Sequence, residues 1–264
     1  MSGNDENPSI SRRNFLRTTL LAAPLALGAD AVLLEPTWLE VRRVRIGSGP
    51  PTCRLAHFSD VHHKGDRKYL QTVVDTINAL NPDFACFTGD IVEQKEHLPA
   101  ALEILSGIKV PLYGVPGNHD YYSGIPFGPV IECFASTGGA WLLGGHEEVA
   151  GGRVNLIGTI CVFPELPVPP SQPGAKNILL THYPARVNDL GGRTFDLLLA
   201  GHSHGGQVRL PLFGSIIVPY FVDGYDMGLY QTPAGPLYVN PGIGYIGHYD
   251  IRFNCRPEIT VIEV

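Results

Sequence analysis

Paired cysteines are missing from this chain of 264 residues, and their absence excludes two kinds of architecture. The five cysteines are far apart and form no CxxC pair, so we expect neither a thiolate zinc site nor a dense disulfide framework. Cys86 lies inside the apolar run Phe84–Phe87 and is expected to be part of the core. Any metal site must therefore use ligands other than sulfur.

An excess of positive charge is also missing. The 19 lysines and arginines are outnumbered by 25 aspartates and glutamates, which gives a net charge of −6. A nucleic-acid-binding protein would need a clustered basic face, so we expect no nucleic-acid partner. An anionic substrate would then depend on the local charge of bound metal.

A long apolar run is absent too, although residues 1–34 differ from the rest of the chain. The segment Ser11-Arg12-Arg13-Asn14-Phe15-Leu16 resembles the twin-arginine export motif. The apolar stretch that follows it has about 12 residues, whereas a membrane span needs about 20. We predict that residues 1–34 form a twin-arginine signal or an N-terminal anchor, and that residues 35–264 form one catalytic domain.

The export motif also predicts a partner and a location. We expect the twin-arginine export machinery to carry the chain to the periplasm or to the outer face of the cytoplasmic membrane. Retention of the N-terminal segment would leave the protein associated with that membrane.

The spacing of apolar residues from position 38 onwards predicts alternating strands and helices. Strands are expected over 38–46, 54–59, 84–88 and 110–115, with helices over 70–80 and 98–105. This alternation implies parallel strands joined by right-handed crossovers. A shorter helix is expected over 130–134, followed by strands over 141–143, 154–160, 178–180 and 197–200. Strands around Val208, Leu229, Tyr238 and Thr260 predict a second, mostly antiparallel sheet.

Polar side chains follow many of these apolar runs. They are Asp60, His62, Asp90, Asn118, His119, His182, His202 and His204. In α/β sheets ligands bind beyond the carboxyl ends of the strands, so we expect these side chains at one edge. Asp90 can give one oxygen to each of two cations about 3.5 to 4 Å apart. Oxygen and nitrogen donors without sulfur favour two divalent cations of Mn, Fe or Zn.

The order D-x-H, G-D, G-N-H-D, a lone His and G-H-S-H, from Asp60 to His204, resembles the calcineurin-like metallophosphoesterase superfamily. The resemblance implies an α/β fold, a four-layer αββα sandwich of two mixed β-sheets flanked by helices, with the metal site at the C-terminal strand ends. It implies one cation held by Asp60, His62, Asp90 and His204. It implies a second cation held by Asp90, Asn118, His182 and His202. A hydroxide between the two would attack phosphorus in line.

The resemblance also assigns catalytic residues. His119 would stabilise the phosphoryl oxygens or protonate the leaving group. Glu93 stands where family phosphatases have an aspartate that orients this histidine, so this chain departs from the pattern at that position. We also consider His63 as a substrate-binding residue, although its neighbour His62 should point elsewhere. Asp120 is either a partner that supports a ligand or a turn residue.

The extension Gly201–Gln207 resembles a narrower bacterial branch of envelope phosphodiesterases that includes UDP-diacylglucosamine diphosphatases. We predict a dinuclear phosphoesterase that cleaves a phosphodiester or pyrophosphate bond in a small-molecule or lipid-linked substrate. The alternatives are a phosphomonoesterase with the same site and a non-catalytic, metal-dependent binding protein.

Overall fold

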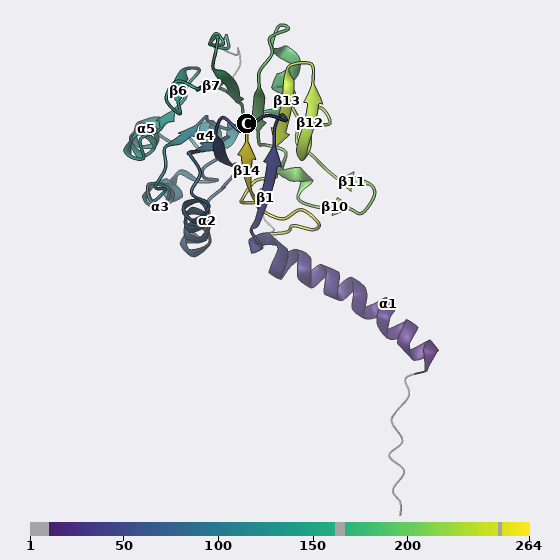
Figure 1. Cartoon of the computed structure of the whole chain (residues 1–264). Helices are drawn as coiled ribbons and strands as arrows, with labels where there is room; N and C mark the ends of the chain where they lie inside the picture. Colours follow the sequence, from purple (N-terminus) through teal and green to yellow (C-terminus); the bar gives the residue numbers. More distant parts are fainter. Residues whose placement is uncertain (1–10, 162–166, 248–249) are drawn as a thin grey trace, which may run out of the picture.

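The computed structural model describes residues 11–161, 167–247 and 250–264, so residues 1–10 of the predicted signal segment lie outside it. Two six-stranded sheets pack face to face, and helices line the outer side of the first sheet (Figure 1). The chain enters through α1 (Arg12–Ala29), which extends away from the sheets, and continues through η1 (Asp30–Leu34) and η2 (Glu35–Thr37). None of the described helices is long and apolar enough to cross a bilayer.

The first sheet has the strand order β1-β14-β2-β3-β4-β5. Its strands are β1 (Glu40–Arg45), β14 (Glu258–Glu263), β2 (Arg54–Phe58), β3 (Phe84–Phe87), β4 (Leu112–Gly114) and β5 (Ala140–Trp141). The strands β2 to β5 pair in parallel, which the alternation of strand and helix predicted for β2, β3 and β4. The last strand, β14, enters between β1 and β2 and is antiparallel to β2.

The helices that connect these strands are α2 (Arg67–Leu80), η3 (Lys95–His97), α3 (Leu98–Leu105), α4 (Asn118–Tyr122) and α5 (Phe127–Ser136). Of these, α2, α3 and α5 lie close to the predicted positions, whereas η3 and α4 were not predicted. Asp66 caps α2 by accepting the backbone N–H of Tyr69 at 3.0 Å, and Asn81 ends this helix in a left-handed conformation. The apolar faces of α2, α3 and α5 bury one side of the first sheet.

The second sheet has the order β12-β13-β9-β8-β7-β6. Its strands are β6 (His146–Val149), β7 (Val154–Gly158), β8 (Lys176–Leu180), β9 (Leu197–Ala200), β12 (Gly228–Thr232) and β13 (Gly235–Val239). Three of its pairings are parallel and two are antiparallel, so the prediction of a mostly antiparallel sheet was wrong. The reason is that β13 is buried on both faces, which suits an interior strand beside β9.

Two other predicted strands take different places. The strand around Thr260 is β14 of the first sheet, and Val208 precedes a separate hairpin of β10 (Arg209–Leu210) and β11 (Gly214–Ser215). The inner faces of the two sheets form one apolar layer, and η4 (Pro184–Asp189) covers the outer face of the second sheet. The predicted fold class, two large mixed sheets flanked by helices, is therefore confirmed.

Candidate metal centre

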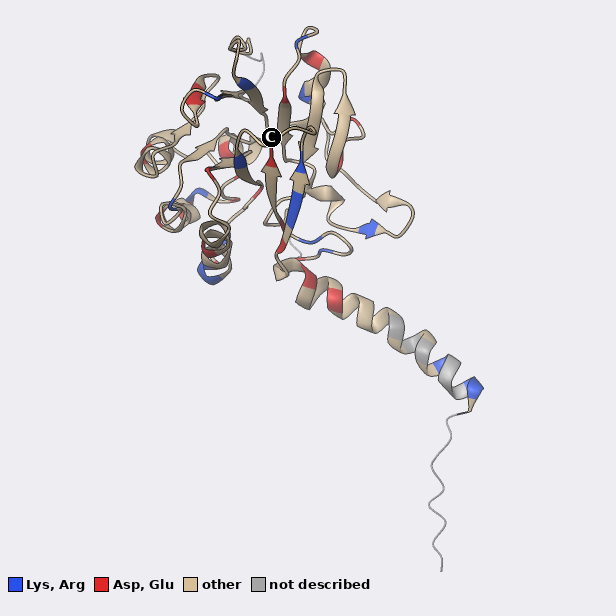
Figure 2. Ribbon diagram, viewed as in Figure 1, with Lys and Arg blue, Asp and Glu red and all other residues tan. Residues whose placement is uncertain are grey.

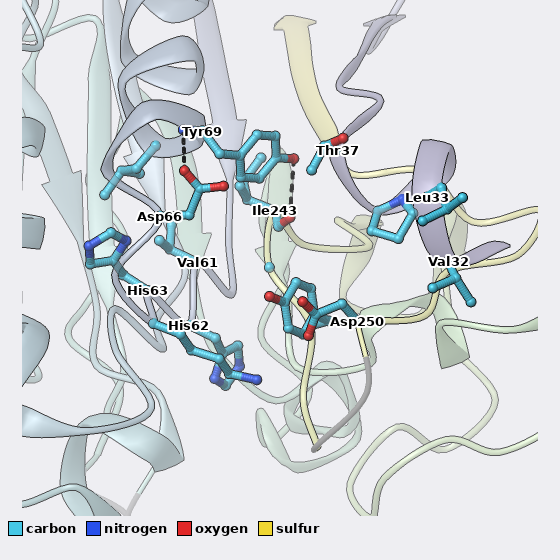
Figure 3. A pocket seen from close by; sticks show the side chains of 15 residues that line it. Val32, Leu33, Thr37, Val61, His62, His63, Asp66, Tyr69, Ile243 and Asp250 are labelled. Carbon is cyan, nitrogen blue, oxygen red and sulfur yellow. Dashed lines mark hydrogen bonds between the residues drawn. The ribbon is translucent and has the colours of Figure 1, made fainter. Parts of the chain in front are cut away.

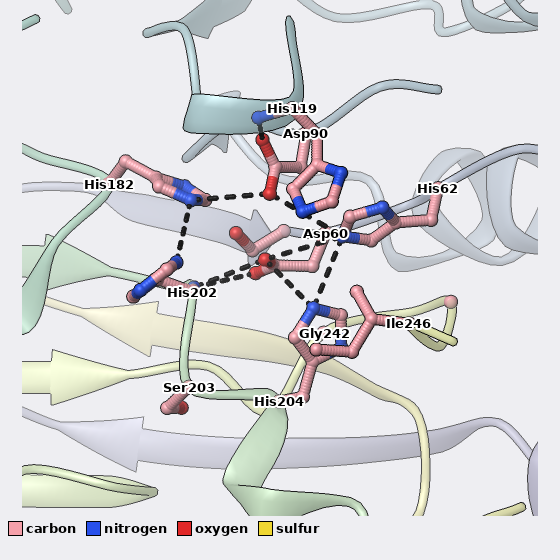
Figure 4. A network of polar contacts seen from close by, with 12 residues as sticks. Asp60, His62, Asp90, His119, His182, His202, Ser203, His204, Gly242 and Ile246 are labelled. Carbon is pink, nitrogen blue, oxygen red and sulfur yellow. Dashed lines mark hydrogen bonds and ion pairs between the residues drawn. The ribbon is translucent and has the colours of Figure 1, made fainter. Parts of the chain in front are cut away.

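The predicted ligands meet beyond the carboxyl ends of four parallel strands (Figure 4). Asp60 and His62 follow β2, Asp90 follows β3, His182 follows β8 and His202 follows β9. Asn118 begins α4 just after β4, and His204 begins η5 (His204–Gly206). All seven side chains are buried. Their polar atoms therefore need partners within the protein or a bound ion.

Three of these residues form a first cluster. Nε2 of His204 lies 3.1 Å from Nε2 of His62 and 3.3 Å from Oδ1 of Asp60. Nε2 of His62 also lies 3.4 Å from Oδ2 of Asp90. These donor atoms face one small space, and with Asp90 they are the four residues that the resemblance assigns to the first cation.

A second cluster lies on the other side of Asp90. Nε2 of His182 is 3.3 Å from Oδ2 of Asp90, 2.9 Å from Oδ1 of Asn118 and 3.2 Å from Nδ1 of His202. The same oxygen of Asp90 therefore contacts a histidine of each cluster. This is the position that a bridging carboxylate requires.

Hydrogen bonds behind the imidazole rings fix which nitrogen faces inward. Nδ1 of His182 contacts the backbone oxygen of Thr88 at 2.6 Å, and Nε2 of His202 contacts that of Tyr220 at 2.8 Å. A carbonyl oxygen only accepts, so these two nitrogens carry the protons. The opposite nitrogens, Nε2 of His182 and Nδ1 of His202, face each other at 3.2 Å, as two ligands of one cation would. The donor set therefore fits divalent metal ions.

The pKa values of the histidines report a concentration of negative charge. Burial alone would lower the pKa of His62 and of His182, but the neighbouring carboxylates raise both to about 9. Burial and the adjacent His182 lower the pKa of His202 to about 3, and burial holds the pKa of His204 well below its usual range. His202 and His204 are therefore neutral imidazoles, which is the form that binds metal.

Backbone strain is concentrated in this cluster. Positive φ angles occur at Asp60 (51°), His62 (41°), Asp90 (65°), His202 (67°) and His204 (50°). Residues with a Cβ rarely adopt this conformation, and each instance costs on the order of 1–3 kcal/mol. Five of the seven predicted ligands thus stand in a conformation that the surrounding fold must impose.

Two glycines allow the chain to approach the carboxylates. A Cβ on Gly117 would collide with the carboxylate of Asp90, and a Cβ on Gly201 would collide with Ser59 and with the carboxylate of Asp60. Both glycines stand next to predicted ligands in the sequence. The close approach explains why glycine precedes Asn118 and His202.

Asp120 supports Asp90. Its carboxylate accepts the backbone N–H groups of Asp90 at 2.9 Å, Ile91 at 2.8 Å and Gly117 at 2.8 Å. Burial and the charge of Asp90 raise the pKa of Asp120 to about 6. Of the two readings open for Asp120, the structure supports that of a residue that positions a candidate ligand.

The predicted catalytic residues lie at the more open side of the cluster. Oε2 of Glu93 lies 2.8 Å from Nδ1 of His62 and 3.2 Å from Nδ1 of His119. Hydrogen bonds from His119 and His62 lower the pKa of Glu93 well below its usual range. The side chain of His119 is 26% exposed, whereas the ligand histidines are nearly inaccessible. His119 is therefore placed to meet a molecule arriving from solvent.

His63 lies apart from the cluster. Its ring stands T-shaped to that of His97, with 6.1 Å between their centroids, and it lines a pocket of about 190 Å³ together with His62, Asp66 and Tyr69 (Figure 3). Val32 and Leu33 of η1 close the far side of this pocket. Substrate contact by His63 stays a prediction.

The sequence did not indicate how the Asp60 loop is held. The backbone N–H groups of Ile243 and Gly244 donate to the carbonyls of Ser59 and Asp60 at 2.9 and 2.7 Å. Arg252 is fully buried and donates to the carbonyls of Pro241 and Gly244, which fixes this second loop. A lone arginine far along the chain gives no local signal of such a role.

Comparison with known proteins places this centre in a family. The model of the calcineurin-like phosphoesterase family matches residues 53–206, a range that holds all the clustered residues. The metallophosphoesterase YkuE of Bacillus subtilis is 31% identical over 97% of this chain and 98% of its own. The phosphodiesterase YaeI of Escherichia coli is 28% identical over 97% and 99%. The UDP-2,3-diacylglucosamine pyrophosphatase LpxG of Chlamydia trachomatis is 27% identical over 93% and 95%.

The chain belongs to the calcineurin-like phosphoesterase family. It has relatives named as a phosphodiesterase and a pyrophosphatase, and it carries the clusters of candidate metal ligands that a metallophosphoesterase needs.

Proposed function

We propose that this protein is a dinuclear phosphoesterase that cleaves a phosphodiester or pyrophosphate bond. The observation that carries the proposal is the position of Asp90, whose Oδ2 lies 3.4 Å from His62 and 3.3 Å from His182. One carboxylate oxygen thus stands between two groups of nitrogen and oxygen donors. A site for a single metal ion would need only one of these two groups of donor atoms.

Each residue then has a defined task. Asp60, His62 and His204 hold one cation, Asn118, His182 and His202 hold the other, and Asp90 belongs to both. Bound divalent cations, of Mn, Fe or Zn, would supply a water of lowered pKa and would neutralise charge on the phosphoryl oxygens. Asp120 and the backbone oxygens of Thr88 and Tyr220 keep the donor atoms directed inward.

His119 and Glu93 act on the substrate side. The ring of His119 reaches solvent and stands T-shaped to that of His62, with 4.8 Å between their centroids. Glu93 accepts from Nδ1 of His119, which leaves Nε2 directed away from the carboxylate. His119 can therefore donate a proton to the leaving-group oxygen or stabilise the phosphoryl oxygens.

The proposed enzyme differs from the two alternatives in the bond that it cleaves: a phosphomonoesterase cleaves a monoester, and a binding protein cleaves none. The similarity to YaeI, a phosphodiesterase, and to LpxG, a UDP-2,3-diacylglucosamine pyrophosphatase, supports a diester or pyrophosphate, and the similarity to LpxG supports a lipid-linked one. A phosphomonoesterase would use the same residues. A non-catalytic binding protein would have no need of His119, which is present and exposed to solvent.

We propose that the twin-arginine signal directs this chemistry to the periplasm or to the outer face of the cytoplasmic membrane. The support is the Arg12-Arg13 pair followed by an apolar stretch too short to span a bilayer. Replacing both arginines by lysine should retain the protein in the cytoplasm, as cell fractionation would show. Export of the double-lysine variant at the normal level would contradict this part of the proposal.

The decisive experiment for the activity is a matrix of metals and substrates. Protein stripped of metal should hydrolyse bis(4-nitrophenyl) phosphate only after Mn, Fe or Zn is restored, and faster than 4-nitrophenyl phosphate. His119→Ala should lose most of this rate while still binding metal. Faster turnover of the monoester would favour the alternative enzyme, and metal binding without turnover of any ester would favour a binding protein.

A further inference from the structure

An apolar groove opens beside the metal centre. It has a volume of about 520 Å³, and Ile216, Ile217, Val218, Ile246 and Ile251 form most of its wall. None of the described residues that line it is an aspartate, glutamate, lysine or arginine. Pockets of this size with an apolar lining are typical of sites that take a hydrophobic ligand.

The groove is continuous with the candidate centre. His204 and Ser203 line it, and His204 is also one of the proposed ligands, with Nε2 3.3 Å from Asp60. Figure 4 shows Ile246 next to His204 at the edge of the polar network. A molecule with its phosphoryl group at the metal centre would therefore have the groove directly beside it.

The outer wall belongs to a longer segment, residues 210–221, that is rich in exposed apolar side chains. Within residues 210–221, the large apolar side chains exposed by more than a third are Leu210, Leu212, Phe213, Ile216, Ile217, Val218, Tyr220 and Phe221. This segment contains no lysine, arginine, aspartate or glutamate, and the hairpin of β10 and β11 is tan in Figure 2 beyond the basic residue at its start. Apolar surface of this extent is uncommon on a soluble face and marks a site that is covered during function.

Polar contacts hold the wall at both ends. Oγ of Ser215 donates to Oδ2 of Asp226 at 2.8 Å, and Nη1 of Arg209 donates to the same oxygen at 2.7 Å. At the other end the backbone oxygen of Tyr220 accepts from His202 at 2.8 Å. The isoleucines between these anchors are thus fixed in place relative to the metal centre.

We propose that the groove binds the hydrocarbon chain of an amphiphilic substrate whose phosphoester lies at the metal centre. The inference rests on the proposed function and narrows its substrate to a long-chain phosphoester. The continuity through His204 argues for one molecule that occupies both sites. Each methylene removed from water should strengthen binding roughly fourfold.

The test compares two diesters that differ only in chain length, 4-nitrophenyl methyl phosphate and 4-nitrophenyl dodecyl phosphate, the latter used below its micelle concentration. The full chain loaded with Mn should show a kcat/KM at least about tenfold higher for the dodecyl ester. Ile217→Ser, which puts a hydroxyl into the groove, should reduce this ratio several-fold. Leu212→Ser changes an even more exposed side chain outside the groove and should leave the ratio as in the wild type.

A binding measurement tests the role of the groove in ligand affinity independently of catalysis. Dodecylphosphonate should bind the full chain at least about tenfold more tightly than methylphosphonate by calorimetry, and Ile217→Ser should remove most of this difference. Equal affinities, or a difference that Ile217→Ser leaves intact, would overturn the inference. A ratio reduced by Leu212→Ser but not by Ile217→Ser would also overturn it and would point to docking on a lipid surface. Failure of both esters to turn over would instead count against the proposed function.

Discussion

Glu93 holds His62 in the orientation that a metal ligand needs, with 2.8 Å between Oε2 of the glutamate and Nδ1 of the histidine. Because Nδ1 donates to the carboxylate, Nε2 faces His204 and Asp90. The same carboxylate contacts His119 at 3.2 Å, so one side chain connects a proposed ligand with the proposed proton donor. We therefore propose that the glutamate at this position takes the orienting role that the resemblance gives to an aspartate.

Replacement of Glu93 should weaken both catalysis and metal binding. We expect Glu93→Gln to lower kcat for a phosphodiester and the affinity for Mn by roughly 10- to 100-fold, as is typical when a partner behind a ligand is changed. Glu96→Gln, three residues away and exposed, is the matched control. Steady-state kinetics across a Mn titration would measure both quantities. A Glu93→Gln protein as active as Glu96→Gln would show that the contact is incidental.

Gly117 should tolerate no side chain. Its φ of −98° is ordinary, so Gly117→Ala acts only through the collision of Cβ with the carboxylate of Asp90. A displacement of about 1 Å in a catalytic group can cost on the order of 10²-fold in rate. Gly128→Ala in α5 is the control, because a Cβ there meets nothing within 4 Å. Comparable activity of the two variants would contradict the close approach.

Local patterns in the sequence predicted the first sheet well and the pairing of later strands poorly. The parallel strands β2, β3 and β4 follow from apolar runs separated by segments with helical spacing. The place of β14 beside β2, and of β13 beside β9, depends on contacts between residues far apart in the chain. A strand's own residues show whether its faces are buried but not which strand lies next to it.

The sequence predicted which residues are candidate ligands, but it did not predict their backbone conformation or the hydrogen bonds that orient them. Their position after apolar runs and their order along the chain are visible in the sequence. The left-handed conformation of Asp60 and Asp90 is not, because aspartate adopts it only occasionally and its presence alone does not indicate it. The acceptors behind His182 and His202 are backbone oxygens, which any residue could supply.

Acid should remove the contribution of Asp226 to stability. Burial opposes ionisation, but hydrogen bonds from Ser215, Tyr230 and Arg209 prevail and hold the pKa of Asp226 below its usual value. A lowered folded-state pKa stabilises the fold above the unfolded pKa of about 3.9 and loses that effect as the pH falls through the folded value. The difference in urea midpoint between wild type and Asp226→Asn should therefore shrink below about pH 4. A difference that is constant from pH 6 to pH 3 would contradict this account.

We propose that the domain begins at residue 35, and Glu35 provides a test. Its buried carboxylate accepts the backbone N–H groups of Asn254 at 2.8 Å and of Cys255 at 2.5 Å, which joins η2 to the loop before β14. A chain of residues 38–264 should unfold with a free energy about 1.5–3 kcal/mol lower than one of residues 35–264. Glu35→Gln in the full chain should change stability in the same direction. Identical urea midpoints for the two truncated chains would place the boundary elsewhere.

The central claim, that Asp90 joins two cation sites, is tested most directly by counting bound metal. Full-length protein equilibrated with Mn and freed of excess ions should contain two ions per chain by inductively coupled plasma mass spectrometry. Asp90→Ala should retain fewer than one while its circular dichroism shows a folded protein, and Glu96→Gln should retain two. A folded wild-type protein with one ion or none, or an Asp90→Ala protein that keeps two, would contradict the account.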